Sequence, residues 1–297
     1  AFMTMFSIVT DTSANLDSAY LKAHDVTVVP FTFLVGDEER TCIDTAAFDG
    51  AAYYNAMRTG ASVRTSQVTP QRYIEHLRPL LEGGNDVLYI GMSSGISGSF
   101  SSASMAAKEL RKEFPTRTIL LVDTLSASLG EGLLVMRAVD CREQGFTLEE
   151  TASLLDRLRH AMCQVFTVED LKYLRATGRI SNIKAALAAV LHIKPILKGD
   201  VEGKIVCAEK VRGRKRSIET LAAQYNEYVR SADAQTIGIA HADCPEEAEQ
   251  LGKLLCRYNP PKRILTVCYE PVTGAHVGPG TLALFFLGDG SFRKCEQ

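Results

Sequence analysis

Serine and threonine residues cluster in three short segments of this sequence, and each cluster could bind an anion through its hydroxyl groups. The segments are residues 10–13 (Thr-Asp-Thr-Ser), residues 91–99 (Gly-Met-Ser-Ser-Gly-Ile-Ser-Gly-Ser) and residues 123–124 (Asp-Thr). Hydroxyls donate hydrogen bonds to anions, but the same residue types also cap helices and form turns. For any one cluster alone, a purely structural role stays open.

Ser97 and Thr65 are harder to explain as structural residues. Glycines near Ser97 let backbone amides approach a ligand, and the helix predicted to begin just after it favours an anion at its N-terminus. Thr65 and Ser66 precede a helix whose N-cap is already Thr69, so their hydroxyls are free for another role. Both places are candidates for an oxyanion-binding site, although loop hydroxyls are common on protein surfaces.

Two later segments carry groups that could contact a ligand or a partner. His276 lies in residues 275–280 (Ala-His-Val-Gly-Pro-Gly), which we expect to form a rigid turn between two apolar strands. The sequence leaves open whether this His is structural or functional. In residues 211–216 (Val-Arg-Gly-Arg-Lys-Arg), positive charges open a predicted helix, where the helix dipole disfavours them. Either an external anion compensates these charges or the segment is a solvated basic turn.

The motifs of nucleotide-binding and common hydrolytic sites are missing from the sequence. Residues 130–132 (Gly-Glu-Gly) begin like a dinucleotide fingerprint, but the third glycine is absent and the segment has a helical pattern. Residues 91–99 lack the Lys of a phosphate-binding P-loop, and G-x-S-x-G, H-E-x-x-H and EF-hand patterns do not occur. The eight cysteines form no C-x-x-C pair and have no His at metal-ligand spacing. We therefore expect no metal and no cofactor.

Composition and charge restrict the class of protein. A chain of 297 residues with 46% hydrophobic content can build two packed domains. Because 33 basic and 35 acidic residues nearly cancel, we expect no nucleic-acid partner. The scattered cysteines are typical of free thiols in a reducing cytosol. No apolar stretch reaches the ~18 residues of a spanning helix and the first residues do not resemble a signal peptide, so we expect a cytoplasmic protein.

The order of predicted elements indicates an α/β fold. In the first half, β-rich runs alternate with helical patterns, which is typical of a parallel sheet. Ligands of such sheets collect at the carboxyl ends of the strands, where the hydroxyl clusters lie. The expected strands are residues 6–10, 26–34, 86–91 and 118–122, and the expected helices are residues 46–57, 70–81, 99–114, 127–144 and 147–160. Thr147 and Glu150 form a predicted capping box at the last helix.

The second half of the chain has a different pattern. Its expected strands are residues 165–168, 193–197, 204–211, 236–241, 263–270 and 281–287, with a hairpin turn at residues 199–203. A hairpin requires antiparallel strands, so this sheet is mixed. We predict two domains: a three-layer α/β/α domain with a mainly parallel sheet (residues 1–161) and a smaller α/β domain with a mixed sheet (residues 162–297).

Taken in this order, the motifs resemble those of the DegV family of bacterial fatty-acid-binding proteins. The resemblance covers nearly the whole chain. It rests on residues 8–12 (Ile-Val-Thr-Asp-Thr), 64–67 (Arg-Thr-Ser-Gln), 93–99 and 123–124, then 171–174 (Leu-Lys-Tyr-Leu), 178–180 (Gly-Arg-Ile), 193–197 (Ile-Lys-Pro-Ile-Leu), and His276 with residues 278–280 (Gly-Pro-Gly). Four positions depart from the commoner pattern of the family: Val68, residues 99–100 (Ser-Phe) and Val277.

The resemblance implies a long-chain fatty acid, similar to palmitate or oleate, bound between the two domains. By motif position, Thr65, Ser97 and His276 are the implied contacts of its carboxylate, and Ser94 and Ser66 are lesser candidates. The family implies that the chain is not itself an enzyme. The resemblance also implies that the chain presents the carboxylate to a separate ATP-dependent fatty-acid kinase subunit, which forms an acyl phosphate.

The resemblance also implies that the basic segment, with Arg212 and Arg214, faces the kinase or a membrane surface. Two other functions stay open. The first is a hydrolase or phosphotransferase that uses Ser97 and His276, although the sequence shows no acidic residue placed to orient that His. The second is a regulatory or scaffold protein whose complexes do not depend on a ligand.

Overall fold

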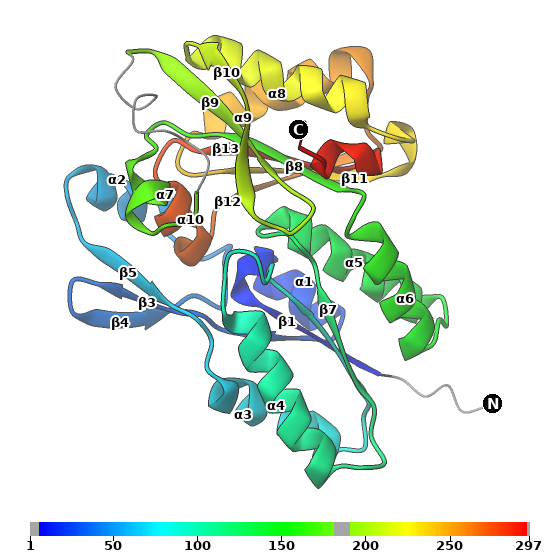
Figure 1. The fold of residues 1–297 in the computed structure, drawn as a ribbon. Coiled ribbons are helices and arrows are strands. Elements are labelled where there is room, and N and C mark those ends of the chain that lie inside the picture. The colour runs from blue at the N-terminus through cyan, green and yellow to red at the C-terminus, as the bar shows by residue number, and fades with distance from the viewer. Residues whose placement is uncertain (1–5, 181–190, 296–297) are drawn as a thin grey trace.

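Two large β-sheets and one small sheet form the framework of the chain in the computed structural model, which describes residues 6–180 and 191–295 (Figure 1). The first large sheet, called here the parallel sheet, has the strand order β2-β1-β6-β7, and every pairing in it is parallel. Its strands are β1 (Ser7–Asp11), β2 (Val26–Val29), β6 (Val87–Gly91) and β7 (Ile119–Asp123). The parallel sheet predicted for the first half is thereby confirmed.

Helices cover both faces of the parallel sheet. One face packs against α3 (Pro70–Glu82) and α4 (Ser99–Glu113), and the other against α5 (Leu129–Glu143) and α6 (Leu148–Leu158). Because both faces are covered, the central strand β6 is buried along its whole length. The predicted caps are present: the Thr69 side chain accepts from the backbone of α3, and Thr147 and Glu150 form a capping box at α6.

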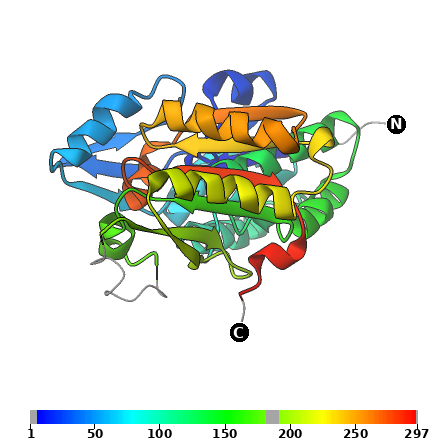
Figure 2. The same cartoon turned by 90° about the horizontal axis from the view of Figure 1, so that it is seen from above.

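The second large sheet, called here the mixed sheet, has the order β10-β9-β8-β13-β11-β12. Only the pair of β11 and β12 is parallel. On its outer side lie α8 (Arg214–Tyr228) and α9 (Pro245–Tyr258), which run side by side (Figure 2). The strands are β8 (Met162–Thr167), β9 (Ile193–Gly199), β10 (Ile205–Arg212), β11 (Thr236–His241), β12 (Arg263–Cys268) and β13 (Leu282–Leu287). The mixed sheet and its hairpin between β9 and β10 are as predicted.

Helix α5 lies between the two large sheets and packs on both of them. Two glycines allow this close approach. A Cβ atom at Gly238 of β11 would stand 2.8 Å from Cβ of Leu129, and one at Gly132 would overlap the carbonyl oxygen of Ala14. Residues 130–132 are therefore a helix-packing segment and not part of a nucleotide loop. Since α5 serves both sheets, the boundary near residue 161 stays a prediction.

One predicted strand, residues 26–34, is wrong as a single element. The chain instead forms β2 and then β3 (Thr32–Val35), which belong to different sheets. Pro30 lies between them and has no amide hydrogen for a strand ladder. The next amide, that of Phe31, donates to Oγ1 of Thr12 at 3.0 Å instead of to a neighbouring strand.

Strand β3 belongs to a small antiparallel sheet that the sequence analysis missed. It lies between β4 (Glu38–Thr41) and β5 (Val63–Ser66). All four residues of β4 are exposed, so their sequence carries no hydrophobic alternation that could have revealed a strand. The remaining helices of the described chain are α1 (Ser18–Ala23), α2 (Gly50–Arg58), α7 (Lys172–Ala176) and α10 (Pro271–Val277).

Candidate functional site

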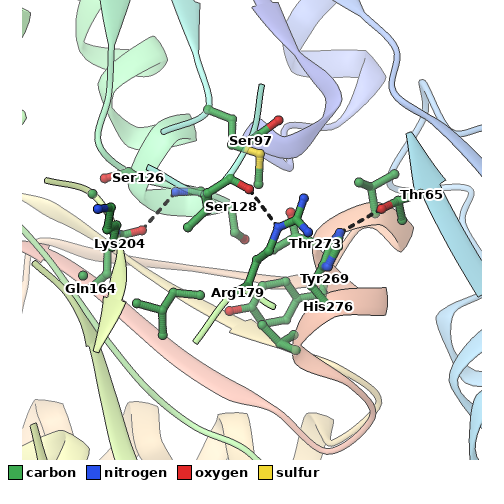
Figure 3. Close-up of a pocket in the computed structure, with 18 of the residues that line it drawn as sticks. Thr65, Ser97, Ser126, Ser128, Gln164, Arg179, Lys204, Tyr269, Thr273 and His276 are labelled. Carbon is green, nitrogen blue, oxygen red and sulfur yellow. Dashed lines mark hydrogen bonds between the residues drawn. The ribbon is translucent and has the colours of Figure 1, made fainter. Parts of the chain in front are cut away.

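A cavity of about 290 Å³ lies between the strand ends of the parallel sheet and the inner side of the mixed sheet (Figure 3). Both halves of the chain contribute to its wall. Its polar residues are Thr65, Ser66, Gln67, Ser97, Ser126, Ser128, Gln164, Arg179, Lys204, Tyr269, Thr273 and His276, and its apolar residues include Phe31, Met92, Ile96, Phe166, Ile205, Val272, Val277 and Phe285. Its volume is at the lower end of the range for small-molecule sites.

Thr65 and His276 form a hydrogen-bonded pair in the wall of this cavity, although they are 211 positions apart in the chain. The distance from Oγ1 of Thr65 to Nε2 of His276 is 2.8 Å (Figure 3). Thr65 is on strand β5, which places its side chain toward α10. The expectation that Thr65 lies in a loop is therefore wrong.

His276 lies in the last turn of helix α10 and not in a turn between strands, as the sequence analysis predicted. The helix forms because the Glu270 side chain accepts hydrogen bonds from the amides of Val272 and Thr273, and Pro271 occupies the first helical position. Residues 278–280 end the helix. Gly278 has a φ of +87°, which favours glycine over any residue with a side chain.

The imidazole of His276 is neutral at physiological pH. Burial, helped by the positive charge of Arg179, lowers the pKa of His276 to about 4. Its Nδ1 atom is buried and has no hydrogen-bond partner among the described residues. An unpaired polar atom in a cavity wall is the kind of group that a ligand or an ordered water satisfies.

Ser97 contributes a third polar group, a hydroxyl, to the same cavity. It lies in the loop between β6 and α4, and its Oγ donates to Oγ of Ser99 at 3.0 Å. The amide of Ser99 in turn donates to Oγ of Ser97 at 3.1 Å. Figure 3 shows Ser97 on one side of the cavity and the Thr65–His276 pair on another. Thus all three residues that the family motifs pointed to line one cavity; their binding of a carboxylate stays a prediction.

The two lesser candidates differ from each other. Ser66, at the end of β5, is exposed and lines the cavity beside Thr65. Ser94 is not among the lining residues, and its amide and hydroxyl both donate to the carboxylate of Asp123. Of the two, only Ser66 is placed to reach a ligand in this cavity.

Arg179 also lines the cavity, although it was not among the predicted site residues. Its Nε donates to the carbonyl oxygen of Ile96 at 3.0 Å, which holds the guanidinium beside the Ser97 loop (Figure 3). The side chain is exposed, so it stands at the edge of the cavity and not in its interior. The available signal was its place in the family motif of residues 178–180, because a guanidinium group is suited to an anionic ligand.

Ser126 and Ser128 were also missed, because the sequence pattern ended at residues 123–124. Both are buried in the turn after β7 and line the cavity. Leu125 and Ser128 have φ values of 54° and 51°, in the left-handed region that side chains rarely adopt. Such strain gathers at functional sites when the surrounding structure enforces it. Here Gln164 enforces it, by accepting from the amide of Ala127 and donating to the carbonyl of Leu125.

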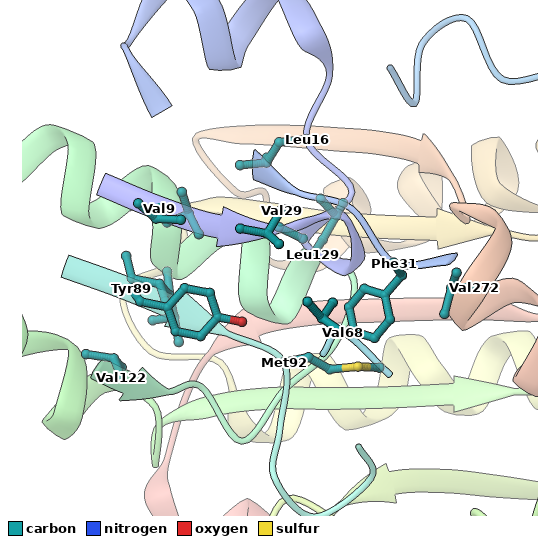
Figure 4. Close-up of a cluster of buried hydrophobic side chains, with 14 of the residues drawn as sticks. Val9, Leu16, Val29, Phe31, Val68, Tyr89, Met92, Val122, Leu129 and Val272 are labelled. Atoms are coloured by element: carbon teal, nitrogen blue, oxygen red, sulfur yellow. The ribbon is translucent and has the colours of Figure 1, made fainter. Parts of the chain in front are cut away.

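The apolar part of the cavity continues the shared hydrophobic core. Phe31, Met92 and Val272 lie together at this point, next to Val68 (Figure 4). These side chains come from both halves of the chain, as do Phe166 and Phe285 from the mixed sheet. The cavity therefore combines a polar end of hydroxyls and imidazole with an apolar lining.

The two arginines of the basic segment have different environments. Arg214, at the start of α8, pairs with Glu247 through Nε at 2.9 Å and donates to the carbonyl of Gly280 at 2.6 Å. Arg212, the last residue of β10, is exposed. The charge at this helix start is thus compensated within the chain at Arg214, which is only partly exposed, whereas Arg212 is the more exposed of the two predicted partner contacts.

Residues 6–180 and 191–295 contain neither a metal-binding cluster nor a membrane-spanning helix. Within these ranges no three His, Cys, Asp or Glu side chains are placed to hold a metal ion. No helix there has the length and apolar character needed to cross a bilayer.

Comparison with known proteins identifies the family. Residues 5–289 match the family model described as an uncharacterised protein of the DegV family. A DegV domain-containing protein of Clostridium perfringens is 35% identical over 97% of this chain and 99% of its own length. A solved DegV family protein from Thermus thermophilus, described as binding fatty acid, has 27% identity and a TM-score of 0.86 over 96% of this chain and 100% of that one.

A second solved structure agrees with this result. It is a fatty-acid-binding DegV family protein from Streptococcus agalactiae, with 29% identity and a TM-score of 0.83 over 96% of this chain and 99% of that one. The similarity in both cases covers nearly the whole chain. From the family match, the sequence identity and the shared fold together, the chain belongs to the DegV family.

Proposed function

We propose that this chain binds a long-chain fatty acid in the cavity between its two sheets, with the carboxylate at Thr65, Ser97 and His276. The observation that carries the proposal is the cavity itself. It joins three polar side chains to an apolar lining, in a family whose solved members are described as fatty-acid-binding proteins.

The acyl chain and the carboxylate of the ligand contribute different amounts of binding free energy. Burying the about 14 methylenes of a palmitate-like chain is worth roughly 11 kcal/mol at about 0.8 kcal/mol each, before ordering costs. Each hydrogen bond to a charged group contributes about 1.5–3 kcal/mol. The acyl chain thus supplies most of the affinity, and the polar side chains fix the position of the carboxylate.

The Thr65–His276 pair suits an anionic head group. A neutral imidazole protonated at Nε2 donates to Oγ1 of Thr65, and the Thr65 hydroxyl then points its own proton at the ligand. A carboxylate removed from water needs such donors, because an unpaired buried charge is costly. Arg179 at the cavity edge adds a positive charge to the same region.

We further propose that the chain presents this carboxylate to a separate ATP-dependent kinase subunit, which forms the acyl phosphate. The sequence contains no nucleotide loop, so ATP would be bound by the partner. Arg212 is exposed at the end of β10 and is the residue that we assign to the contact with this partner or with a membrane surface.

The geometry does not favour a hydrolase or phosphotransferase that uses Ser97 and His276. Nε2 of His276 pairs with Thr65, whereas Ser97 donates to Ser99. No described residue accepts from Nδ1 of His276, so the orienting acid of a catalytic triad has no counterpart here.

Native mass spectrometry of the protein purified from a bacterial host tests the proposal. One long-chain fatty acid is expected per chain, and the delipidated protein should bind added palmitate or oleate. A chain that carries no adduct and binds neither acid would overturn it. A purified fatty-acid kinase subunit with ATP should then convert the bound acid to acyl phosphate. If no such subunit converts the bound acid, the proposed role with a kinase is wrong, but the proposed fatty-acid binding is not affected.

A further inference from the structure

A buried chain of hydroxyl groups leads away from the cavity at Ser97. Oγ of Ser97 donates to Oγ of Ser99, and Ser99 also accepts from the amide of Val68 at 3.0 Å. The Tyr73 hydroxyl lies next to the Ser99 side chain, which affects its pKa, and lies 2.5 Å from the Tyr89 hydroxyl. Ser99, Tyr73 and Tyr89 are all fully buried. A continuous path of hydroxyls therefore runs from the cavity wall into the core.

The chain of hydroxyls ends at two buried acids. The Tyr89 hydroxyl donates to Oδ2 of Asp11 at 3.1 Å. Ser13 links Asp11 to Glu131, because its amide donates to Asp11 and its hydroxyl donates to Glu131. Both acids are fully buried. Two neighbouring buried carboxyl groups cannot both ionise without a large cost, so the pair holds at least one proton. Figure 4 shows the Tyr89 hydroxyl directed toward the side of the core where Val68 and Met92 lie.

Neutral donors surround this pair. Asp11 accepts from the amides of Ser13 and Met92, and Glu131 accepts from the hydroxyls of Thr10 and Ser13. Burial is the first cause that raises the pKa of each acid, and the negative charge of Asp11 adds to the rise at Glu131.

The charged neighbour of the pair is another acid. This acid is Glu270, the N-cap of α10, and the charge of Asp11 contributes to raising the pKa of Glu270. The main causes of the pKa shifts of Asp11 and Glu131 include no cation. An added proton on the pair would therefore remove an unfavourable buried charge.

The hydrogen bonds of the chain have a defined direction. Ser99 accepts from both Ser97 and Val68, so its own proton is directed to Tyr73. When the proton of the acid pair is on Glu131, Asp11 is ionised and only accepts, so Tyr89 donates to Asp11 and Tyr73 donates to Tyr89. Every hydroxyl thus donates away from the cavity. Ser97 then presents an oxygen lone pair to the ligand and not a proton.

This direction fits a protonated fatty acid but not a carboxylate, which needs donors. We propose that binding of a carboxylate at Ser97 is coupled to the uptake of one proton by the Asp11–Glu131 pair, through reversal of the hydrogen bonds of Ser99, Tyr73 and Tyr89. The inference rests on the proposed fatty-acid function and adds a proton-coupled binding step to it.

The proton transfer from the fatty acid to Asp11 leaves every hydroxyl group of the chain neutral. The O–H bond of the acid breaks as its proton bonds to Oγ of Ser97, and each hydroxyl passes its former proton to the next oxygen inward. The last proton forms an O–H bond on Asp11. The ligand is left as a carboxylate that accepts from Ser97, and Asp11 donates to Tyr89. For a fatty acid that is ionised in solution, the same end state takes one proton from water.

Calorimetric titration of the delipidated protein with decanoate tests the coupling. The dependence of the binding enthalpy on the ionisation enthalpy of the buffer gives the number of protons taken up, which should be about one per ligand. The Kd for decanoate should rise about tenfold from about pH 7 to pH 8. The carbonyl-carbon NMR signal of bound 1-¹³C decanoate should be that of an ionised acid. A signal of the protonated acid, or binding with no proton uptake, would overturn the coupling.

The variant Tyr89→Phe interrupts the chain without removing a ring. Proton uptake is expected to fall from about one to near zero, and Kd should become independent of pH. Tyr73→Phe should have the same effect, which guards against misfolding of either variant. Tyr225→Phe is the matched control, since this buried hydroxyl donates to the carbonyl of Asn259, remote from the cavity. Unchanged uptake in both chain variants would overturn the proposal.

Failure of the coupling and failure of the proposed function give different results. If wild-type protein shows neither heat nor a bound carbon signal with decanoate, palmitate or oleate, the fatty-acid function itself fails. If it binds without taking up a proton, the function stands and only the coupling is wrong.

Discussion

At the scale of single residues, the cavity brings together side chains that no sequence window contains. Thr65 on β5 and His276 on α10 share a hydrogen bond, and Ser97 reaches the same cavity from the loop before α4. Each hydroxyl alone fits a turn or a cap. Their convergence on one cavity, beside a buried unpaired nitrogen, is what makes them a candidate binding site.

The double substitution of Thr65→Ala with Ser97→Ala tests the carboxylate contacts. Loss of two hydrogen bonds to a charged group should raise the Kd for palmitate by roughly 100-fold or more, with the fold unchanged. Fluorescent fatty-acid displacement measures this. Ser104→Ala is the control, because its hydroxyl donates to the carbonyl of Phe100 within α4. An unchanged Kd in the double variant would place the carboxylate elsewhere.

The neutral state of His276 predicts a pH dependence of stability. Its pKa is about 4 in the folded chain, below the about 6.5 of an unfolded His, so this group stabilises fully above about pH 6.5. That contribution is lost as pH falls toward 4. The free energy of unfolding of wild type should therefore decrease more from pH 7 to pH 5 than that of His276→Gln, as measured with urea. Parallel decreases would mean that His276 titrates normally.

At the scale of secondary-structure elements, helix α10 determines the position of His276. Its N-cap is the buried Glu270, and its middle residue Gly274 packs against α2. The hydroxyl of Tyr54 on α2 donates to the carbonyl of Tyr269 at 2.7 Å, just before the helix begins. The His side chain is thus fixed by contacts of a seven-residue helix that propensity alone would not stabilise.

Gly274→Ala tests this packing. In most helices the change from glycine to alanine stabilises by about 1 kcal/mol, but here the added Cβ would overlap the Tyr54 hydroxyl. We expect a loss of about 1–3 kcal/mol in the free energy of unfolding and weaker fatty-acid binding. Gly290→Ala, where a Cβ meets nothing within 4 Å, should change stability by less than about 0.5 kcal/mol. A more stable Gly274→Ala variant would contradict this account.

At the scale of the whole molecule, helix α5 joins the two large sheets into one hydrophobic core. It contacts β1 and β6 of the parallel sheet and β8, β11 and β13 of the mixed sheet. The same buried cluster contains Val9 from one sheet and Phe285 from the other. The cavity lies between these layers, so the binding site depends on both halves being folded.

This arrangement predicts a single cooperative unfolding transition. The two sheets share α5 and should not unfold separately, so far-ultraviolet and near-ultraviolet circular dichroism should give the same midpoint in urea, and calorimetric and van't Hoff enthalpies should agree. Two resolved transitions would show that residues 1–161 and 162–297 are independent domains after all. A saturating fatty acid should raise the midpoint, because it binds the folded state only.

The two arginines of the basic segment provide a matched pair for the proposed partner contact. Arg212→Ala should reduce acyl-phosphate formation with a fatty-acid kinase subunit while leaving stability and fatty-acid binding unchanged. Arg214→Ala should lower the melting temperature, since it removes the pair with Glu247 and the bond to the Gly280 carbonyl. If Arg212→Ala leaves phosphorylation unaffected, the partner contacts another surface.

By itself, the sequence determined the α/β class, the parallel and mixed sheets, the approximate limits of most helices in the first half, and the family. These properties depend on local patterns: Thr69 and the capping box at Thr147 mark helix starts, and alternating β-rich runs mark strands. The hydroxyl segments were recognisable for the same reason, because glycine and serine spacing is visible within a few residues.

Only the tertiary structure decided which of these groups meet. Pro30 divided a predicted strand and created the small sheet that carries Thr65, and α10 replaced an expected turn at His276. The links between Ser97 and the buried acid Asp11 depend on contacts between α3, β6 and β1, which are distant in the chain. No local pattern encodes such contacts, because they arise from the packing of complete helices on complete sheets.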